Sequence, residues 1–274
     1  MPDGRPSSAG GGIRFCVLAS GSKGNVVYVS DGETTILIDA GLSGIEIERR
    51  LRSRHLDPAG IDAIVVSHEH ADHIRGVGVL ARRHRLPVYL ARGTQTSAAT
   101  ALGRLDHLVH FQPGLAFAIG TLRLHPFALP HDAADPSGFT VEAHGAKLGI
   151  ATDLGIAPAM IRTHLADCAA LVLEANHDPR MLVEGPYPWP LKQRIAGRTG
   201  HLSNADTRDL LGRVRHDGLR HVVLAHLSEI NNTPECALSV VAQGLGPCRA
   251  ELTVARQGQP TEMIHLPRDD QRPA

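Results

Sequence analysis

Short apolar runs alternate with polar, glycine-rich segments along the first fifth of the chain. The runs over 13–19, 26–30 and 34–38 predict three strands, joined by the turn-rich loop 20–25 and by the hairpin signal Asp31-Gly32. A helix is expected next, from Ser43 as its N-cap to about Arg54. Glu46, three residues after Ser43, would complete a capping box.

Strands and helices then alternate to the end of the chain. Apolar runs predict strands over 61–66, 87–90, 170–173 and 222–225, and several more between about 107 and 150. Helical periodicity predicts helices over 74–85, 94–102, 157–164, 191–196, 204–215 and 234–243. Each half offers strands first and then mixed units. This order suits two sheets packed face to face with helices outside, so we predict an α+β fold, a four-layer αββα sandwich.

The ends of the chain are polar, and no linker interrupts the part between them. We predict a disordered tail over 1–12, one domain over 13–266, and a second disordered tail over 267–274. The first tail lacks the apolar core of a secretory signal, and no stretch is long enough to span a bilayer. We therefore expect a cytoplasmic protein without a membrane partner.

Charge and cysteine content narrow the expected partners and compartment. Lysine plus arginine number 28, as do aspartate plus glutamate, so a nucleic-acid contact would need a local basic patch or bound metal. The cysteines lack metal-finger spacing, which indicates a reducing compartment without disulfides. Cys16 is expected to be buried in a strand, whereas the polar surroundings of Cys168 and Cys236 suit exposed positions.

The strongest chemical signal is the run His68-x-His70-x-Asp72-His73, directly after the predicted strand 61–66. Imidazole nitrogens and a carboxylate suit zinc, manganese or iron. Two histidines two residues apart can converge on one metal ion. Asp72 and His73 then indicate a second ion, because one tetrahedral site would be overcrowded. The alternatives are a solvated histidine-rich loop and, for Asp72, a helix N-cap.

A strand followed by HxHxDH resembles the signature of the metallo-β-lactamase superfamily, and residues 37–41 (LIDAG) are similar to its DxG strand end. The resemblance covers nearly the whole chain. It implies a metal-dependent hydrolase with two divalent metal ions, Zn or Mn, one held by His68, His70 and His131. The other ion would be held by Asp72, His73 and His226, with Asp153 bridging both.

The three later ligands implied by the resemblance share one local feature. His131, Asp153 and His226 each follow an apolar run, as a cleft at one sheet edge requires. Taken singly, each has an alternative: a surface or core histidine, or a capping aspartate. Asp39 is a candidate for a hydrogen bond that orients a ligand histidine.

Four further segments resemble the YycJ/WalJ branch, a set of metal-dependent nucleases to which double-stranded DNA 5′-exonuclease activity is attributed. They are residues 19–25 (ASGSKGN), 173–178 (LEANHD), 200–204 (GHLSN) and 225–232 (AHLSEINN). The GHLS and AHLS segments are also similar to motifs of ribonuclease Z, which cleaves RNA. No cysteine stands at the second-metal position, where many antibiotic-hydrolysing relatives have one, and this favours phosphoesters over β-lactams.

These resemblances predict a metal-dependent phosphodiesterase, and within that class a DNA exonuclease, in which a metal-bridging hydroxide attacks phosphorus. The candidate catalytic residues are Asp72, a metal ligand, and His201, the proton donor implied by the ribonuclease Z motif. The alternative for His201 is a histidine at a helix start. Substrate-binding candidates, for which plain loop or turn roles are the alternative, are His177, Ser20, Ser22 and Asn25.

Two alternatives stay open at this point. The same dinuclear site could serve a small-molecule acyl hydrolase acting on a thioester or lactone. Or the fold could be a non-catalytic module, against which the complete ligand set argues.

The best local basic patch for nucleic acid consists of Lys192, Arg194 and Arg198, near Trp189, which could stack on a base. A solvated helix face is the alternative. The sequence does not determine the identity of the metal, whether the substrate is DNA or RNA, the direction of digestion or the oligomeric state.

Overall fold

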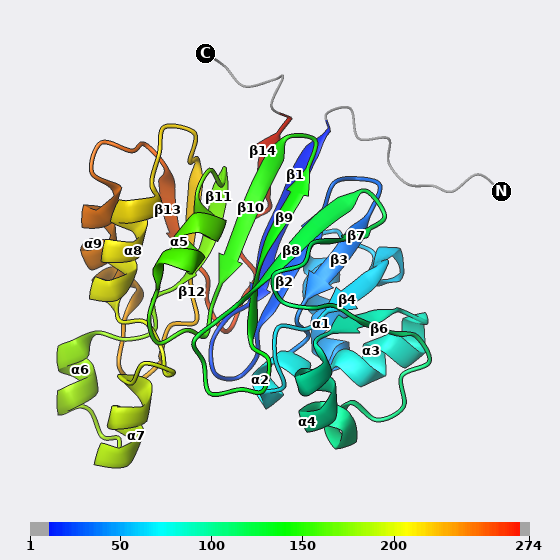
Figure 1. Cartoon of the computed structure of the whole chain (residues 1–274), viewed down its shortest axis with the longest axis horizontal. Helices are drawn as coiled ribbons and strands as arrows, with labels where there is room; N and C mark the ends of the chain where they lie inside the picture. The colour runs from blue at the N-terminus through cyan, green and yellow to red at the C-terminus, as the bar shows by residue number, and fades with distance from the viewer. Residues whose placement is uncertain (1–10, 269–274) are drawn as a thin grey trace.

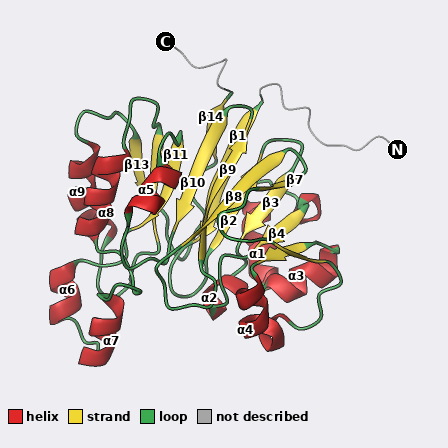
Figure 2. Ribbon diagram, in the orientation of Figure 1, coloured by secondary structure: helices red, strands yellow, loops and turns green. Residues whose placement is uncertain are grey.

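The computed structural model describes residues 11–268, which form two seven-stranded sheets packed face to face, with helices on both outer faces (Figure 1 and Figure 2). This is the predicted α+β four-layer αββα sandwich. Strand pairing reaches Gly12 and Pro267, one residue beyond the predicted domain at each end. The rest of the two predicted tails, apart from Gly11 and Arg268, lies outside the described residues.

Each sheet combines an antiparallel half with a parallel half. The first sheet has the order β14 (Ile264–Pro267), β1 (Gly12–Ala19), β2 (Val26–Ser30), β3 (Thr35–Ile38), β4 (Ala63–Val65), β5 (Val88–Leu90) and β6 (Leu108–His110). The second has the order β13 (Glu251–Val254), β12 (His221–Ala225), β11 (Ala170–Glu174), β10 (Ala146–Ala151), β9 (Ser137–Ala143), β8 (Leu122–Ala128) and β7 (Phe117–Ile119). Strands β3 to β6 and β10 to β13 are parallel, so their carboxyl ends gather at one edge of each sheet.

The helices divide between the two outer faces. The first sheet is covered by α1 (Gly44–Ser53), α3 (Val77–His84) and α4 (Arg92–Leu102), and the second by α5 (Ala159–Leu165), α8 (Asn204–Val214) and α9 (Pro234–Leu245). The remaining short elements are η1 (Pro58–Gly60), α2 (Ala71–Ile74), α6 (Pro179–Glu184) and α7 (Trp189–Ile195). None of the helices in the described part of the chain has the length and apolarity of a membrane span.

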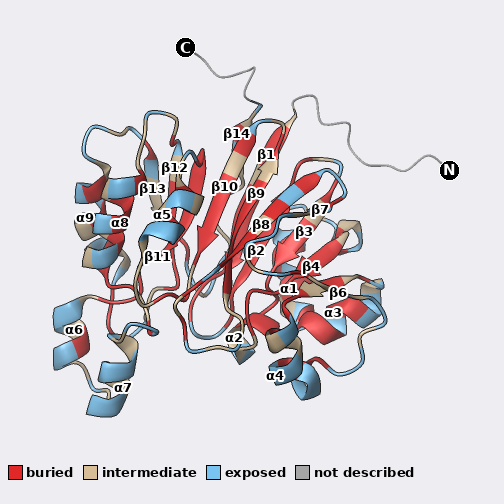
Figure 3. Cartoon of the chain, viewed as in Figure 1, coloured by how far each residue is buried: buried red, intermediate tan, exposed pale blue. Residues whose placement is uncertain are grey.

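Three apolar layers hold the sandwich together. The central layer lies between the sheets and joins Phe15 and Val29 of the first to Phe139 and Val141 of the second. The other two layers lie under the outer helices, and Figure 3 shows the strands buried while the helices expose one side. Burial of alternate strand residues on both faces explains why these strands read as nearly continuous apolar runs.

Three local predictions were wrong in detail. The helix predicted over 74–85 is α3, which begins only at Val77; Ile74 ends the separate short helix α2, and Gly76 lies between the two. A Cβ atom on Gly76 would lie 2.3 Å from the carbonyl oxygen of Leu42, so the chain packs there without a side chain. Ser43 caps α1 by accepting from the amide of Glu46, but the Glu46 carboxylate pairs with arginines instead of completing the box. Cys168 is buried, not exposed.

Candidate metal centre

Three of the residues that follow strands have left-handed backbone conformations. Asp39, Asp153 and His226 follow β3, β10 and β12 with φ of 62°, 63° and 54°. A residue other than glycine in this region costs about 1–3 kcal/mol, and such residues concentrate at functional sites. The turn after each strand directs the side chain toward the edge of the sandwich where the carboxyl ends of the parallel strands of both sheets lie.

The first donor group consists of His68, His70 and His131. The Nε2 atom of His68 lies 3.1 Å from Nδ1 of His70, and Nε2 of His131 lies 3.3 Å from the same atom. His68 follows β4, His70 precedes α2, and His131 follows β8. Because Nδ1 of His131 lies 3.2 Å from the carbonyl oxygen of Gly200, to which it donates, its Nε2 lone pair is left for an ion. The structure brings together the three residues that the resemblance assigned to one ion.

The second donor group consists of Asp72, His73 and His226. Oδ2 of Asp72 lies 3.6 Å from Nε2 of His73 and 3.5 Å from Nε2 of His226. Nδ1 of His73 donates to Oδ2 of Asp39 at 2.7 Å, which confirms the prediction that Asp39 orients a histidine of the centre. Asp72 lies inside α2 and is not its N-cap; that position is held by His70.

Asp153 lies between the two groups. Its Oδ2 is 3.3 Å from Nε2 of His73, and its Oδ1 is 3.4 Å from Nε2 of His226 and 4.0 Å from Nε2 of His131. Oδ2 of Asp153 and Nε2 of His226 are buried without a hydrogen-bond partner among the described residues. Buried polar atoms of this kind need a partner, and divalent cations fit these nitrogen and oxygen donors.

Buried carboxylates give the centre negative charge, which favours the binding of cations. Burial disfavours charge on His226, but the carboxylates of Asp153, Asp72 and Glu174 outweigh this and raise its pKa to about 10. Burial and the repulsion of His73 hold the pKa of His68 well below its ordinary value. A neutral His68 has a lone pair free for coordination.

Glu174, which the sequence analysis did not single out, organises the second half of the centre. It is completely buried, and Oε2 accepts hydrogen bonds from the amides of Leu154 and Leu202, each at 3.0 Å. Oε1 accepts from Nδ1 of His201 at 2.8 Å and from Nδ1 of His226 at 3.0 Å. The available signal was its place at the end of an apolar strand, the feature that supported the assignment of Asp153 and His226.

His201 connects the centre to an open cavity. Burial opposes charge on His201, but the contact with Glu174 raises its pKa above the ordinary value. Its side chain is 21% exposed, and Nδ1 also lies 3.8 Å from Oδ1 of Asp153. The cavity has a volume of about 190 Å³ and is lined by Ser22, Asp132, Asn176, Tyr187, Leu191, Arg194, Ile195, Gly200, His201 and Ser228. Since Nδ1 faces Glu174, Nε2 is the nitrogen left to serve a substrate.

The four substrate-binding candidates occupy different places. Ser22 lines the cavity beside His201. Ser20 is buried, and its hydroxyl accepts from the amide of His226 at 2.6 Å. Asn25 is buried and donates to Oδ2 of Asp72 at 3.2 Å. His177 is buried too, with no partner for Nδ1 among the described residues. Ser20 and Asn25 therefore support the centre, because their polar groups are used within the protein.

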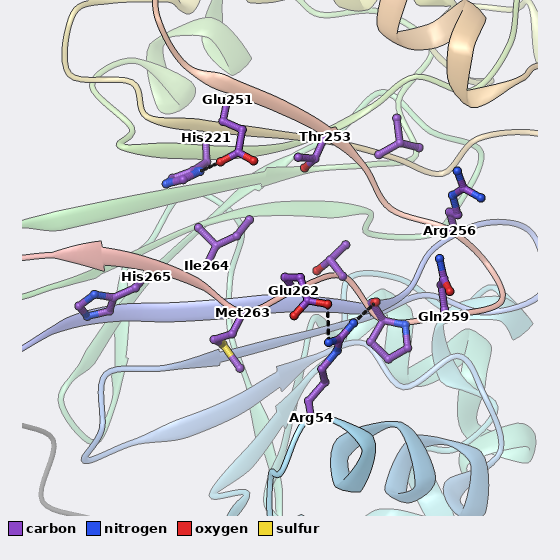
Figure 4. Close-up of a pocket in the computed structure, with 13 residues that line it drawn as sticks. Arg54, His221, Glu251, Thr253, Arg256, Gln259, Glu262, Met263, Ile264 and His265 are labelled. Atoms are coloured by element: carbon purple, nitrogen blue, oxygen red, sulfur yellow. Dashed lines mark hydrogen bonds and ion pairs between the residues drawn. The ribbon is translucent and has the colours of Figure 1, made fainter.

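A larger hollow, about 510 Å³, lies between the edge strands β13 and β14 (Figure 4). Arg54 lines this hollow, and its guanidinium donates to Oε1 of Glu262 at 2.6 Å and to the carbonyl oxygen of Pro260 at 2.7 Å. His221 and Glu251 also line the hollow, and Nδ1 of His221 lies 3.4 Å from Oε2 of Glu251. The lining of the smaller cavity is bound to the metal donors: His201 lies 3.8 Å from Asp153, and the carbonyl of Gly200 accepts from Nδ1 of His131. The described residues of the larger hollow have no such contact with the donors, so the candidate site is the smaller cavity.

The sequence and the fold are similar to those of known proteins. The family described as Beta-lactamase superfamily domain matches residues 34–227. Exodeoxyribonuclease YycJ of Bacillus anthracis is 39% identical over 236 residues, which are 85% of this chain and 89% of that protein. Exodeoxyribonuclease WalJ of Streptococcus pneumoniae is 35% identical over 82% of this chain and 86% of its own. Among solved structures, the metallo-beta-lactamase fold protein YhfI from Bacillus subtilis superposes with a TM-score of 0.70 at 16% identity, covering 91% of this chain and 99% of that one.

Proposed function

Since the chain belongs to the metallo-β-lactamase superfamily and to its YycJ/WalJ branch, and is thus a metal-dependent hydrolase, we propose that it hydrolyses nucleic-acid phosphodiesters as a DNA exonuclease. One observation carries the proposal: two donor groups meet around Asp153, and His201 lies at the mouth of the cavity beside them. The names of the two curated relatives supply the substrate class and the exonucleolytic mode.

In this proposal the residues present would hold two divalent ions. His68, His70 and His131 would bind one, and Asp72, His73 and His226 the other, with Asp153 placed between the two groups. The set contains nitrogen and oxygen donors without thiolate, which suits Zn or Mn. When bound, the ions would lower the pKa of a water molecule and offset negative charge on the diester.

The protein's own groups would then handle the proton and the leaving group. Glu174 holds His201 through Nδ1 and favours its protonated form, so Nε2 can donate to the departing alkoxide. Asp72 would serve as a ligand, and the Asn25 amide, which donates to its Oδ2, holds that carboxylate in place. Ser22 lines the cavity and can contact a substrate phosphate.

The alternative, hydrolysis of a small thioester or lactone, fits the cavity less well. Pockets that enclose a whole small ligand span roughly 300–1,000 Å³. The cavity beside His201 measures about 190 Å³. This size favours a long substrate of which only one part enters.

The test is digestion of end-labelled DNA by the protein loaded with Zn or Mn. We expect progressive release of short products from one end, together with hydrolysis of bis(p-nitrophenyl) phosphate. Thioesters and lactones assayed in parallel should turn over much more slowly. Inert DNA beside rapid thioester turnover would refute the proposal and favour the acyl hydrolase.

A further inference from the structure

Helices α6 and α7 with the loop between them, residues 179–195 (the α6–α7 segment), project from the body of the sandwich at the lower left of Figure 1. Helix α7 contains no buried residue, whereas α8 buries five. Figure 3 shows much of the segment exposed, and Leu182 is its buried residue. A helix that buries no side chain adds little to the core, so its side chains serve the surface.

Trp189, the sole tryptophan of the chain, begins α7 with its side chain in solvent. It is 61% exposed, and the neighbouring Val183 is 62% exposed. Pro188 and Pro190 flank Trp189, so the backbone is stiff on both sides of the ring. An aromatic residue on a stiff backbone has little backbone freedom to lose when a ligand covers it, which suits a binding anchor.

The sequence that follows Trp189 is basic although the whole chain is neutral. Residues 185–201 contain Lys192, Arg194 and Arg198 and no acidic residue. The Lys192 ammonium donates to the carbonyl of Val183 at 2.6 Å, which joins α7 to α6. Arg198 is exposed. An exposed aromatic ring beside positive charge matches a nucleic-acid strand, which offers bases for stacking and phosphates for the cations.

The α6–α7 segment is also tied to the candidate metal centre. The amide of His201 donates to the carbonyl of Ile195 at 2.9 Å, so the last residue of α7 holds the proton donor. Arg194 pairs at 2.6 Å with Asp132, the neighbour of His131. Tyr187 and Arg194 form part of the cavity wall beside His201. The surface that carries Trp189 is therefore continuous with the cavity.

From this continuity we propose that the α6–α7 segment, together with the turn after α7 that carries Arg198, binds the DNA strand that leads to the metal centre: one base stacks on Trp189, and Arg198 contacts a phosphate. The inference rests on the proposed function, because it assigns a place to the substrate of that reaction. It adds a binding surface outside the donor groups and predicts which variants lose affinity for DNA.

The first experiment uses Trp189 as its own probe. A single-stranded oligonucleotide with phosphorothioate linkages, which resist cleavage, is titrated into the metal-loaded protein. Stacking should quench the tryptophan fluorescence saturably. Anisotropy of a labelled strand then compares variants: Trp189→Leu should weaken binding by roughly 5- to 150-fold, the range that corresponds to the ~1–3 kcal/mol of one base stacked on an aromatic ring. Trp189→Phe, which keeps an aromatic face, should retain most of the affinity.

A second measurement tests the phosphate contact. The slope of log affinity against log salt should fall by about 0.7 in Arg198→Ala, the value for one phosphate of a single strand. Arg123→Ala, an exposed arginine on β8 paired with Glu142, is the matched control and should keep the slope of the parent protein.

The outcomes separate this inference from the proposed function. DNA digestion without fluorescence quenching would overturn the binding surface and leave the nuclease intact. Quenching without digestion would support the surface and refute the nuclease. Fluorescence that changes with protein concentration alone, while DNA has no effect, would show that a second copy of the chain covers Trp189, and would also overturn the inference.

Discussion

Replacing Glu174 by glutamine tests how the protein holds its histidines. Each oxygen of the Glu174 carboxylate accepts two hydrogen bonds, Oε2 from two backbone amides and Oε1 from Nδ1 of His201 and of His226. Glutamine keeps only one accepting oxygen and turns an NH₂ group toward the other pair. The backbone amides cannot change, so the two histidines would have to move their Nδ1 protons to Nε2. The exchanged tautomer blocks Nε2 of His226 from an ion and leaves no charge to stabilise protonated His201.

The size of the effect follows from the proton donor that is lost. A positioned general acid contributes about 10²- to 10⁴-fold in rate, so Glu174→Gln, which removes the charge that keeps His201 protonated, should lower kcat about 10²- to 10⁴-fold. The carboxylate contact also raises the pKa of His201. The activity of Glu174→Gln should therefore be lost at lower pH than that of the parent, because its proton donor deprotonates earlier.

The assay is hydrolysis of bis(p-nitrophenyl) phosphate over a pH series at saturating metal, with bound metal and thermal unfolding measured on the same samples. Glu174→Asp keeps the charge on a shorter side chain and should recover part of the rate. If Glu174→Gln bound its full metal, melted normally and stayed within about threefold of the parent rate, the positioning role would be refuted. An unshifted pH profile would show that Glu174 does not set the protonation of His201.

Three further predictions follow from other parts of the structure. His70→Ala should lose one metal equivalent and nearly all turnover, measured by elemental analysis and by kcat, whereas the exposed His107→Ala should keep both. Hydrogen bonds from arginine and histidine side chains lower the pKa of Glu48 from 4.5 to about 2. The ionised Glu48 carboxylate therefore stabilises the fold above about pH 4.5, and this effect is lost as the pH falls toward 2. Glu48→Gln should lower the free energy of unfolding at neutral pH, measured by urea titration, and should make no difference near pH 2. Gly76→Ala, whose Cβ would lie 2.3 Å from the carbonyl of Leu42, should lower both the melting temperature and the metal content, because the strain falls between α2 and α3.

The sandwich could be predicted from the apolar runs, because strands buried on both faces read as such runs. The donor groups followed from the resemblance to the superfamily, and the run His68-x-His70-x-Asp72-His73 carried that resemblance. The positions of Asp153 and His226 after strands supported the assignment, because a ligand type there lies at the carboxyl edge of a sheet. Since parallel strands bring their ends together, the positions in the chain translate into neighbours in space.

Other features could not be derived because they depend on contacts between distant segments. Glu174 also ends a strand, but its role depends on His201 and His226 being within reach of one oxygen. Asn25 looked available to substrate, yet its amide is used by Asp72, 47 positions along the chain. The break at Gly76 arises from packing against Leu42, which leaves no mark on helical periodicity.

Anomalous diffraction from crystals of the protein loaded with Mn or Zn tests the central claim most directly. The account predicts two anomalous peaks, one bonded to the imidazoles of His68, His70 and His131, and one to Asp72, His73 and His226, with Asp153 touching both. No peak within bonding distance of Asp153, or a peak held by other residues, would contradict it.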